Sequence, residues 1–345
     1  MTLSARLNAG RRLLRPLTIQ DEAAVVAALS RIEVAGWLTS VPHPYGVADF
    51  RDWLATAPRN AVWAIEDAGV FVGLIALKPD GPGYWIVPEA QGRGHASAAL
   101  AAVLAAHFAD PEAGDLPARC FADNATSAHV LEEAGFRERG RAMQFARARG
   151  AEVEQRVFML DRDTWAARNP LVIDTPYLRL APLEVPRDIA ALARMGGQAV
   201  VARNTGSLLS PWPEDVVRAW IEALPWRGCP GFRLGVWRNG RLIGVVQLQR
   251  KASEIGLFLD PAEWGKGYAR EALQALIASA FARFGLPSLS ATVFADNAAS
   301  LRLLRGLGFV ETGRGEGESP ARIGLHPTVL LRLDRAAGNG QDAAP

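Results

Sequence analysis

Two stretches of the chain repeat apolar residues at helical spacing. In the first stretch these residues are Leu100, Val103, Leu104 and Phe108. In the second they are Leu273, Leu276, Ile277 and Phe281. Intervals of three and four residues place such side chains on one face of a helix. The pattern therefore predicts two similar helices, each with one face in a core.

Short apolar runs on either side of these helices predict strands. The runs before each helix form two hairpins, 62–65 with 70–77 and 233–237 with 242–249, the second turning at Asn239-Gly240. A third run follows each hairpin, at 84–87 and at 254–259. Beyond each helix, we expect a strand that ends at Phe121 or Phe294 and a second helix over about 124–134 or 297–307. Gly135 and Gly308 follow, as is usual past a helix end.

The same order of elements occurs twice because the sequence itself repeats. Residues 88–140 align without a gap on residues 261–313, and both segments contain the string Phe-Ala-Asp-Asn-Ala. So long a repeat indicates a duplicated domain rather than a solenoid. We predict two tandem domains of the α/β class (α+β, with a mixed sheet) at 1–166 and 174–336. A linker at 167–173 would join them, and 337–345 would be a disordered tail.

The composition of the chain argues against several classes of binding partner. The chain is 49% hydrophobic and 21% charged, with a formal net charge of +2 and no basic stripe, so no nucleic acid is expected. No apolar run is long enough to span a membrane. The two cysteines, Cys120 and Cys229, are far apart, which disfavours a disulfide framework or a cysteine metal site. These features predict a cytoplasmic protein without a metal.

Glycine-rich loops open both helices. The first is Gln91-Gly92-Arg93-Gly94-His95-Ala96, and the second is Trp264-Gly265-Lys266-Gly267-Tyr268-Ala269. The first N–H groups of a helix have no partner within it, so they attract anions, and glycine lets a phosphate approach the backbone. Arg93 and Lys266 add a cation to each loop. Both loops are therefore predicted to bind a phosphate or a pyrophosphate.

Two common phosphate-binding motifs do not fit. A dinucleotide fingerprint would need a third glycine where the chain has Ser97 and Arg270. A Walker loop would need serine or threonine after Lys266, and Gly267 stands there.

The loops instead resemble the signature of the GNAT (Gcn5-related) N-acetyltransferase superfamily. That signature is Gln or Arg, two residues, Gly, one residue, then Gly or Ala at a helix start, and residues 91–96 satisfy it. The second loop begins with Trp264, a variant similar to the ribosomal-protein N-terminal acetyltransferase (RimJ/RimL-like) branch. Asn124 and Ser127 before Gly135-Phe136, and Asn297 and Ser300 before Gly308-Phe309, also resemble that branch.

The resemblance implies a function and a set of contacts. The chain would transfer an acetyl group directly from acetyl-CoA to a primary amine, on a small molecule or a protein N-terminus. Both loops, including His95 and Tyr268, would bind acetyl-CoA, with Asn124 and Asn297 as further contacts. Backbone groups of Val87 or Leu259 would pair with the pantetheine arm, as a peptide adds to a sheet edge.

Acetyl transfer needs a base for the amine and a proton for the thiolate. Glu254, which enters an apolar strand, is the candidate base of the second half, although a solvated strand-edge residue is an equal alternative. Gly81 aligns with it in the first half, where no base is found. Ser127 and Ser300 match the serine that the branch is thought to use as the acid. Asn124 with Ser127 also fits a helix N-cap and a polar first turn.

The aromatic residues between the first two strands of each half would wall the acceptor site, by the same resemblance. They are Trp37, Tyr45, Trp53, Trp212, Trp220 and Trp226, and for Trp53 and Trp220 we favour core packing. The rival hypothesis is an acyl-CoA-binding pseudoenzyme or regulatory module with one or both halves non-catalytic. The arrangement we favour has an active second half and a structural first half. The acceptor, the oligomeric state and an internal pseudo-dimer of the two halves stay open.

Overall fold

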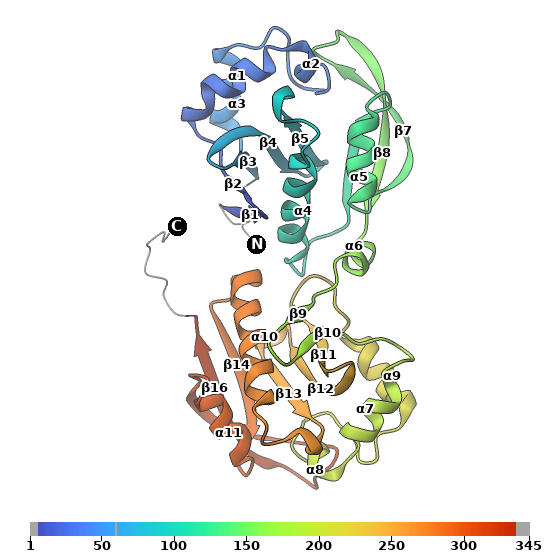
Figure 1. The fold of residues 1–345 in the computed structure, drawn as a ribbon, viewed down its shortest axis with the longest axis vertical. Coiled ribbons are helices and arrows are strands. Elements are labelled where there is room, and N and C mark those ends of the chain that lie inside the picture. The colour runs from blue at the N-terminus through green and yellow to red at the C-terminus, as the bar shows by residue number, and fades with distance from the viewer. Residues whose placement is uncertain (1–5, 59–60, 336–345) are drawn as a thin grey trace. The chain divides into compact units, whose positions relative to one another are not determined.

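The computed structural model describes residues 6–58 and 61–335. The chain forms two compact units, Met1–Arg168 and Asn169–Pro345 (Figure 1). Helix α6 (Arg162–Arg168) ends the first unit, and strand β9 (Ile173–Asp174) opens the second. The tail predicted at 337–345 lies outside the described residues. Each unit is described by itself below.

The N-terminal unit contains two antiparallel sheets. The larger has the order β1-β2-β3-β4-β5 and consists of Leu7–Ala9, Arg12–Pro16, Val62–Asp67, Val70–Lys78 and Gly81–Ile86. The smaller has the order β6-β8-β7 and consists of Leu116–Phe121, Ala151–Leu160 and Arg137–Ala146. The predicted hairpin at 62–77 is confirmed as the β3–β4 pair, and the strand that ends at Phe121 is confirmed as β6.

Helices cover these sheets and separate the strands in sequence. The first three are α1 (Glu22–Leu29), α2 (Ile32–Ala35) and α3 (Val47–Thr56), between β2 and β3. Helix α4 (His95–Phe108) packs against β1, β4 and β5, and α5 (Ala125–Glu133) follows β6. The apolar face predicted for α4 is confirmed, because Leu100, Val103, Leu104 and Phe108 are all buried.

The C-terminal unit repeats the plan. Its larger sheet has the order β13-β12-β11-β10-β9, where β10 to β13 are Arg179–Pro182, Phe232–Arg238, Arg241–Leu248 and Ile255–Leu259. Its smaller sheet has the order β14-β16-β15, made of Ser288–Phe294, His326–Asp334 and Val310–Gly317. The helices are α7 (Ile189–Gly196), α8 (Ala199–Ala202), α9 (Glu214–Ala223), α10 (Tyr268–Phe284) and α11 (Ala298–Arg305).

Several sequence expectations need correction. Every strand pair that forms a ladder in the described residues is antiparallel, and the parallel pairing found there is the isolated bridge between Glu254 and Ser290, so the sheets are not mixed. Helix α10 continues to Phe284, which is buried, while Phe281 is partly exposed. Its buried face therefore uses Phe284 at the end where we expected Phe281. Strands β7 and β15 escaped prediction because most of their residues are exposed and polar.

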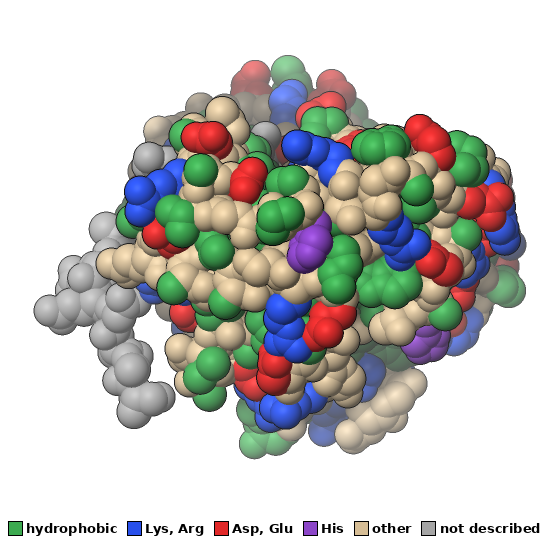
Figure 2. Space-filling model, turned by 90° about the horizontal axis from the view of Figure 1, so that it is seen from above, with side chains coloured by type: hydrophobic (Ala, Val, Ile, Leu, Met, Phe, Trp, Pro, Cys, Tyr) green, Lys and Arg blue, Asp and Glu red, His purple; other side chains and the backbone are tan. Residues whose placement is uncertain are grey.

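A basic stripe would show in the placement of the charged side chains, and a membrane span in the helix lengths. On the face drawn in Figure 2, acidic and basic side chains are interspersed, and no continuous basic stripe crosses it. Every helix within residues 6–58 and 61–335 is too short or too polar to span a lipid bilayer.

Candidate functional site

Both glycine loops adopt a backbone conformation that favours glycine. Gly92, Gly94, Gly265 and Gly267 have φ angles of 73°, 72°, 74° and 85°, and Gly94 and Gly267 are the N-cap residues of α4 and α10. A Cβ atom built at Gly92, Gly265 or Gly267 would meet no heavy atom within 4 Å. The glycines are thus required by the turn, and the space above them is open to a ligand.

The first N–H groups of α4 and α10 point out of these open loops. The first bonds within the helices are Ala98 N–H to the Gly94 carbonyl and Arg270 N–H to the Gly267 carbonyl. The amides before them have no helical acceptor and carry the positive end of the helix dipole. Lys266 belongs to the second loop, and its Nζ lies 3.0 Å from the buried carboxylate of Glu263. Both loops can therefore accept a pyrophosphate.

Gln91 and Trp264, which open the two loops, make equivalent hydrogen bonds although their side chains differ. The Gln91 side-chain amide donates to the carbonyl of Ile86, the last residue of β5, at 3.0 Å. The Trp264 indole N–H donates to the carbonyl of Leu259, the last residue of β13, at the same distance. Both side chains tie the loop to the end of the preceding strand, so the tryptophan variant keeps the geometry of the loop.

The expectation of a free Val87 backbone is wrong for its N–H group, which donates to the Val72 carbonyl at 2.9 Å. The Val87 carbonyl accepts from Ala90 N–H at 2.9 Å and has one lone pair left for a ligand, so a contact through this oxygen remains a prediction. In the C-terminal unit, Asp260 N–H donates to the Ile243 carbonyl. Because backbone groups alternate in direction along a strand, the N–H of Leu259 points away from β12. The prediction for Leu259 therefore remains open to test.

His95 and Tyr268 point their side chains into the protein. His95 is 2% exposed, and its Nδ1 accepts from Arg12 Nε at 2.8 Å. Burial lowers the pKa of this imidazole, with the Arg12 charge as a further cause, so it is neutral near pH 7. Tyr268 is 9% exposed beneath the Arg238 guanidinium. Contacts from these two residues to a ligand would therefore come from their backbone N–H groups.

The two asparagines cap helices, as the alternative interpretation predicted. The Asn124 side-chain oxygen accepts from Ser127 N–H at 2.9 Å, and that of Asn297 accepts from Ser300 N–H at 3.1 Å. Each cap fixes a serine in the first turn of its helix. A contact from either asparagine to a cofactor remains a prediction.

The two serines differ in their surroundings. The hydroxyl of Ser127 lies 3.1 Å from that of Tyr84, whose pKa burial raises to about 12, so the tyrosine stays protonated. Ser300 lines a cavity, and its hydroxyl has no hydrogen-bond partner within the described residues. Of the two, Ser300 is the hydroxyl that lines a cavity and is free of a protein partner among the described residues.

Glu254 and Gly81 occupy aligned positions of the two units, but only the C-terminal unit has room for a side chain there. Glu254 is partly buried at the entry of β13, and it forms the isolated bridge to Ser290 of β14. Gly81, at the start of β5, has a φ of 115°, and a Cβ there would lie 2.1 Å from the Pro117 carbonyl oxygen. Strands β5 and β6 are thus too close for any side chain at position 81. The N-terminal unit cannot hold a carboxylate where the C-terminal unit has Glu254.

This close approach gives a stability prediction. Gly81→Ala should lower the free energy of unfolding of the N-terminal unit by about 3 kcal/mol, because it adds a backbone clash to an unfavourable φ. Gly83→Ala is the matched control on the same strand, since a Cβ at Gly83 meets nothing within 4 Å. Denaturant unfolding followed by tryptophan fluorescence measures both variants. Equal stabilities would contradict the close approach of β5 and β6.

A cavity of about 450 Å³ lies between the two sheets of the C-terminal unit. Strands β12, β13 and β14 and helix α11 contribute to its lining, which brings together Glu254, Asn297 and Ser300. The carboxylate and hydroxyl predicted from the sequence therefore share one cavity. Among the described residues, no group of three or more His, Cys, Asp or Glu side chains could hold a metal ion.

The predicted aromatic wall is only partly present. Trp220 lines the cavity and also packs against the core, which confirms the packing that we favoured for it. Trp53 likewise packs against the core of its own unit. Trp212, Trp226 and Tyr45 are buried and belong to the interior.

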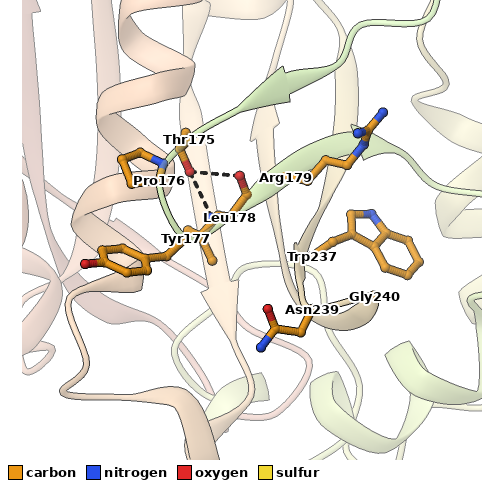
Figure 3. A pocket seen from close by; sticks show the side chains of 8 residues that line it. All are labelled: Thr175, Pro176, Tyr177, Leu178, Arg179, Trp237, Asn239 and Gly240. Carbon is orange, nitrogen blue, oxygen red and sulfur yellow. Dashed lines mark hydrogen bonds between the residues drawn. The ribbon is translucent and has the colours of Figure 1, made fainter.

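A second pocket, of about 340 Å³, lies beside the turn between β9 and β10 (Figure 3). It contains none of the predicted site residues. Its wall is held by Thr175, whose hydroxyl bonds to the Leu178 backbone and to Glu271 in the first turn of α10. Glu271 thereby has a protein partner beside the second glycine loop.

Comparison with known proteins identifies the family of the chain. The family model described as an acetyltransferase (GNAT) domain matches residues 11–137 and again residues 178–310. The chain belongs to the GNAT acetyltransferase family. Its two units are two copies of the GNAT domain, and each copy contains one of the glycine loops.

Individual relatives resemble parts of this GNAT chain. The uncharacterized N-acetyltransferase YoaA of Bacillus subtilis is 37% identical over 91 residues, which are 24% of this chain and 51% of YoaA. The uncharacterized N-acetyltransferase p20 of Bacillus licheniformis is 36% identical over 86 residues, 25% of this chain and 42% of p20. The chain thus spans about half the length of these curated relatives. A solved structure of Mycobacterium smegmatis RimJ in complex with CoA-disulfide has 26% identity and a TM-score of 0.39, over 46% of this chain and 85% of that one.

Sequence reasoning missed some groups that shape the cavity of this GNAT protein. Glu318 lines it from the segment between β15 and β16, which lies past the aligned repeat. Gln247 and Gln249, at the end of β12, also line it. The alternation of apolar and polar residues over 246–249 (Val-Gln-Leu-Gln) could have identified Gln247 as a side chain on the sheet face.

Proposed function

We propose that this GNAT protein is an acetyl-CoA-dependent N-acetyltransferase whose C-terminal unit performs the reaction. The observation that carries the proposal is a single cavity whose lining includes both Glu254 and Ser300. Strand β13 joins this cavity to the open loop at Gly265 and Gly267, because Glu254 precedes its first residue and Leu259 is its last. A single cosubstrate along β13 would therefore meet both the anion site and the reactive groups.

The loop provides the binding groups for acetyl-CoA. Backbone amides at Gly267, Tyr268 and Ala269 would donate to the pyrophosphate, and Lys266 would add charge. Leu259 N–H, on the side away from β12, would pair with the amide-bearing pantetheine arm. In the N-terminal unit, the backbone of residues 92–96 would make the same phosphate contacts, with Arg93 as the cation.

Within the cavity, Glu254 would act as the general base. It accepts a proton from the acceptor ammonium, directly or through a water molecule, and the free amine attacks the thioester carbonyl. As the carbon–sulfur bond breaks, the Ser300 hydroxyl gives its proton to the sulfur and regains one from the positively charged nitrogen. The products are the acetylated amine and the CoA thiol, and Glu254 then releases the proton it took from the ammonium to solvent, which restores the base.

A separate role follows for the N-terminal unit. Its loop is open at Gly92, and the Arg12 guanidinium lies 3.9 Å from a Cβ at Gly94, but the contact of Gly81 with Pro117 excludes a base at the equivalent position. Tyr84 also occupies the Ser127 hydroxyl. We infer that this unit is a non-catalytic domain that retains a CoA loop. Domain limits of 1–166 and 174–336, and a cytoplasmic location, remain part of the proposal.

Turnover of the intact chain tests the proposal. Acetyl-CoA is incubated with a panel of primary amines, the released thiol is measured with a chromogenic disulfide, and the acetylated product is identified by mass spectrometry. We expect equal amounts of thiol and acetylated amine for at least one acceptor. Thiol release that is independent of every amine would show hydrolysis and would overturn the assignment as an N-acetyltransferase.

A further inference from the structure

The cavity in the C-terminal unit has a one-sided charge. Among the residues that line it, the ionisable ones are Glu254 and Glu318, and the lining includes no Lys, Arg or His. Neither carboxylate forms an ion pair within the described residues. When a cavity is lined by carboxylates and by no cationic side chain, it favours a positively charged ligand. Glu254 has a role in the proposed reaction, whereas Glu318 has none.

Glu318 is an exposed residue of the cavity lining, and the residues that follow it are anchored to the protein. Ser319 is 4% exposed, and its hydroxyl donates to the Ala202 carbonyl at 3.3 Å. Arg322 donates to both oxygens of Asp296 at 2.9 Å and covers the Phe294 ring at 4.3 Å. These contacts fix the segment that carries Glu318, and Asp296 engages the charge of Arg322.

The rest of the lining suits an organic cation. Trp220, Phe258 and Phe294 contribute ring surface to the cavity, and rings of this kind attract ammonium groups. Gln247, Thr292 and Thr328 add neutral hydrogen-bonding groups. Aromatic surface with carboxylates and no lining cation is unfavourable for an acceptor that carries its own carboxylate or phosphate.

Two cations lie behind the wall and bear on this inference: Arg322, on the Phe294 ring and paired with Asp296, and Arg233. Arg233 is 8% exposed, donates to the Gln247 side chain at 3.2 Å, and stacks on Trp220 at 3.7 Å. Burial lowers its pKa to about 10, so it is charged near pH 7. Arg233 is absent from the cavity lining, and Trp220 and Gln247, the two residues it contacts, belong to that lining.

We infer that the acceptor is a small amine with a second cationic group, of the aliphatic diamine or polyamine class. The inference rests on the proposed function and adds to it the substrate class. The reacting amino group would lie at Glu254, and Glu318 would hold the second ammonium group at the mouth. An amino acid acceptor would bring a carboxylate toward Glu318 and is excluded by the same charges.

Three acceptors of equal chain length test this class. They are 1,5-diaminopentane, pentylamine and 5-aminopentanoate, assayed with the intact chain at saturating acetyl-CoA. We expect kcat/KM for the diamine to exceed that for pentylamine by about tenfold, as for a hydrogen bond to a charged group. The value for 5-aminopentanoate should be the lowest of the three. A preference for 5-aminopentanoate would show that Arg233 is the anchor and would overturn the inference.

Matched variants locate the second charge. Glu318→Gln should remove most of the advantage of the diamine over pentylamine, mainly through a higher KM for the diamine. Glu316→Gln replaces an exposed carboxylate near the end of β15, two residues before Glu318, that does not line the cavity, and it should keep the preference. An unchanged diamine preference in Glu318→Gln would overturn the role of Glu318.

The design separates this inference from the proposed function. If pentylamine is acetylated and the diamine has no advantage, the substrate class is wrong and the acetyltransferase assignment stands. If no amine is acetylated, the assignment falls, and calorimetric titration of 1,5-diaminopentane into the protein decides the inference alone. Binding that Glu318→Gln removes would support the diamine site, and absence of binding would overturn it.

Discussion

Replacing Gly267 with glutamate is expected to abolish acetyl-CoA binding by the C-terminal unit. The residue has a φ of 85°, and a Cβ there would point into open space above the first amides of α10. A glutamate would strain the loop and put a carboxylate where the pyrophosphate is proposed to bind. Turnover of any amine acceptor should fall below detection in this variant.

Gly285→Glu is the matched control for this substitution. Gly285 is the C-cap of the same helix, has a φ of 60°, and has nothing within 4 Å of a Cβ. The backbone strain and the added charge are therefore similar, but the site lies at the opposite helix end. We expect this variant to lose a little stability and to bind acetyl-CoA normally. Normal binding in Gly267→Glu, or equal loss in both variants, would contradict a phosphate site at the loop.

Glu254→Gln should lower kcat by about 100-fold or more, the range for loss of a general base. Glutamine keeps the size and hydrogen-bonding capacity of the side chain and removes its ability to take a proton. Acetyl-CoA binding, measured by calorimetry, should remain unchanged because Glu254 lies at the opposite end of β13 from the loop. Ser300→Ala should lower kcat by a smaller factor, since water can supply a proton to the thiolate.

The rate of Glu254→Gln also separates two roles for the carboxylate. If Glu254 were a solvated strand-edge residue, its replacement would change kcat no more than Glu316→Gln does. A general base predicts, in addition, that the remaining activity of Glu254→Gln rises steadily toward the pKa of the amine, since only free amine can react. Equal turnover of the wild type and Glu254→Gln at every pH would contradict catalysis by Glu254.

The duplicated plan of the chain could be predicted from the sequence because its signals are local. Glycine in both loops indicates a backbone conformation with positive φ, and the spacing of Leu100, Val103 and Leu104 predicts a buried helix face. The change from Gln91 to Trp264 was unexplained by sequence alone. In the structure both side chains donate to the end of the preceding strand, so a shared donor, rather than a shared shape, is what the position requires.

The remaining features depend on contacts that the sequence does not display. Whether Ile86 or Val87 faces the open edge is set by the register of β4 and β5, and a shift of one residue reverses the answer. The distance between β5 and β6 makes Gly81 irreplaceable, and it arises from packing of two sheets. Glu318 reaches the cavity because Ser319 and Arg322 fix a segment without regular structure.

The most direct test of the account is calorimetric titration of acetyl-CoA into Gly94→Glu. This variant disables the N-terminal loop and leaves the C-terminal one intact. We predict binding with one acetyl-CoA per chain, together with amine acetylation at the wild-type rate. Absence of binding, or binding without acetylation of any amine, would contradict the claim that the C-terminal unit is the acetyltransferase.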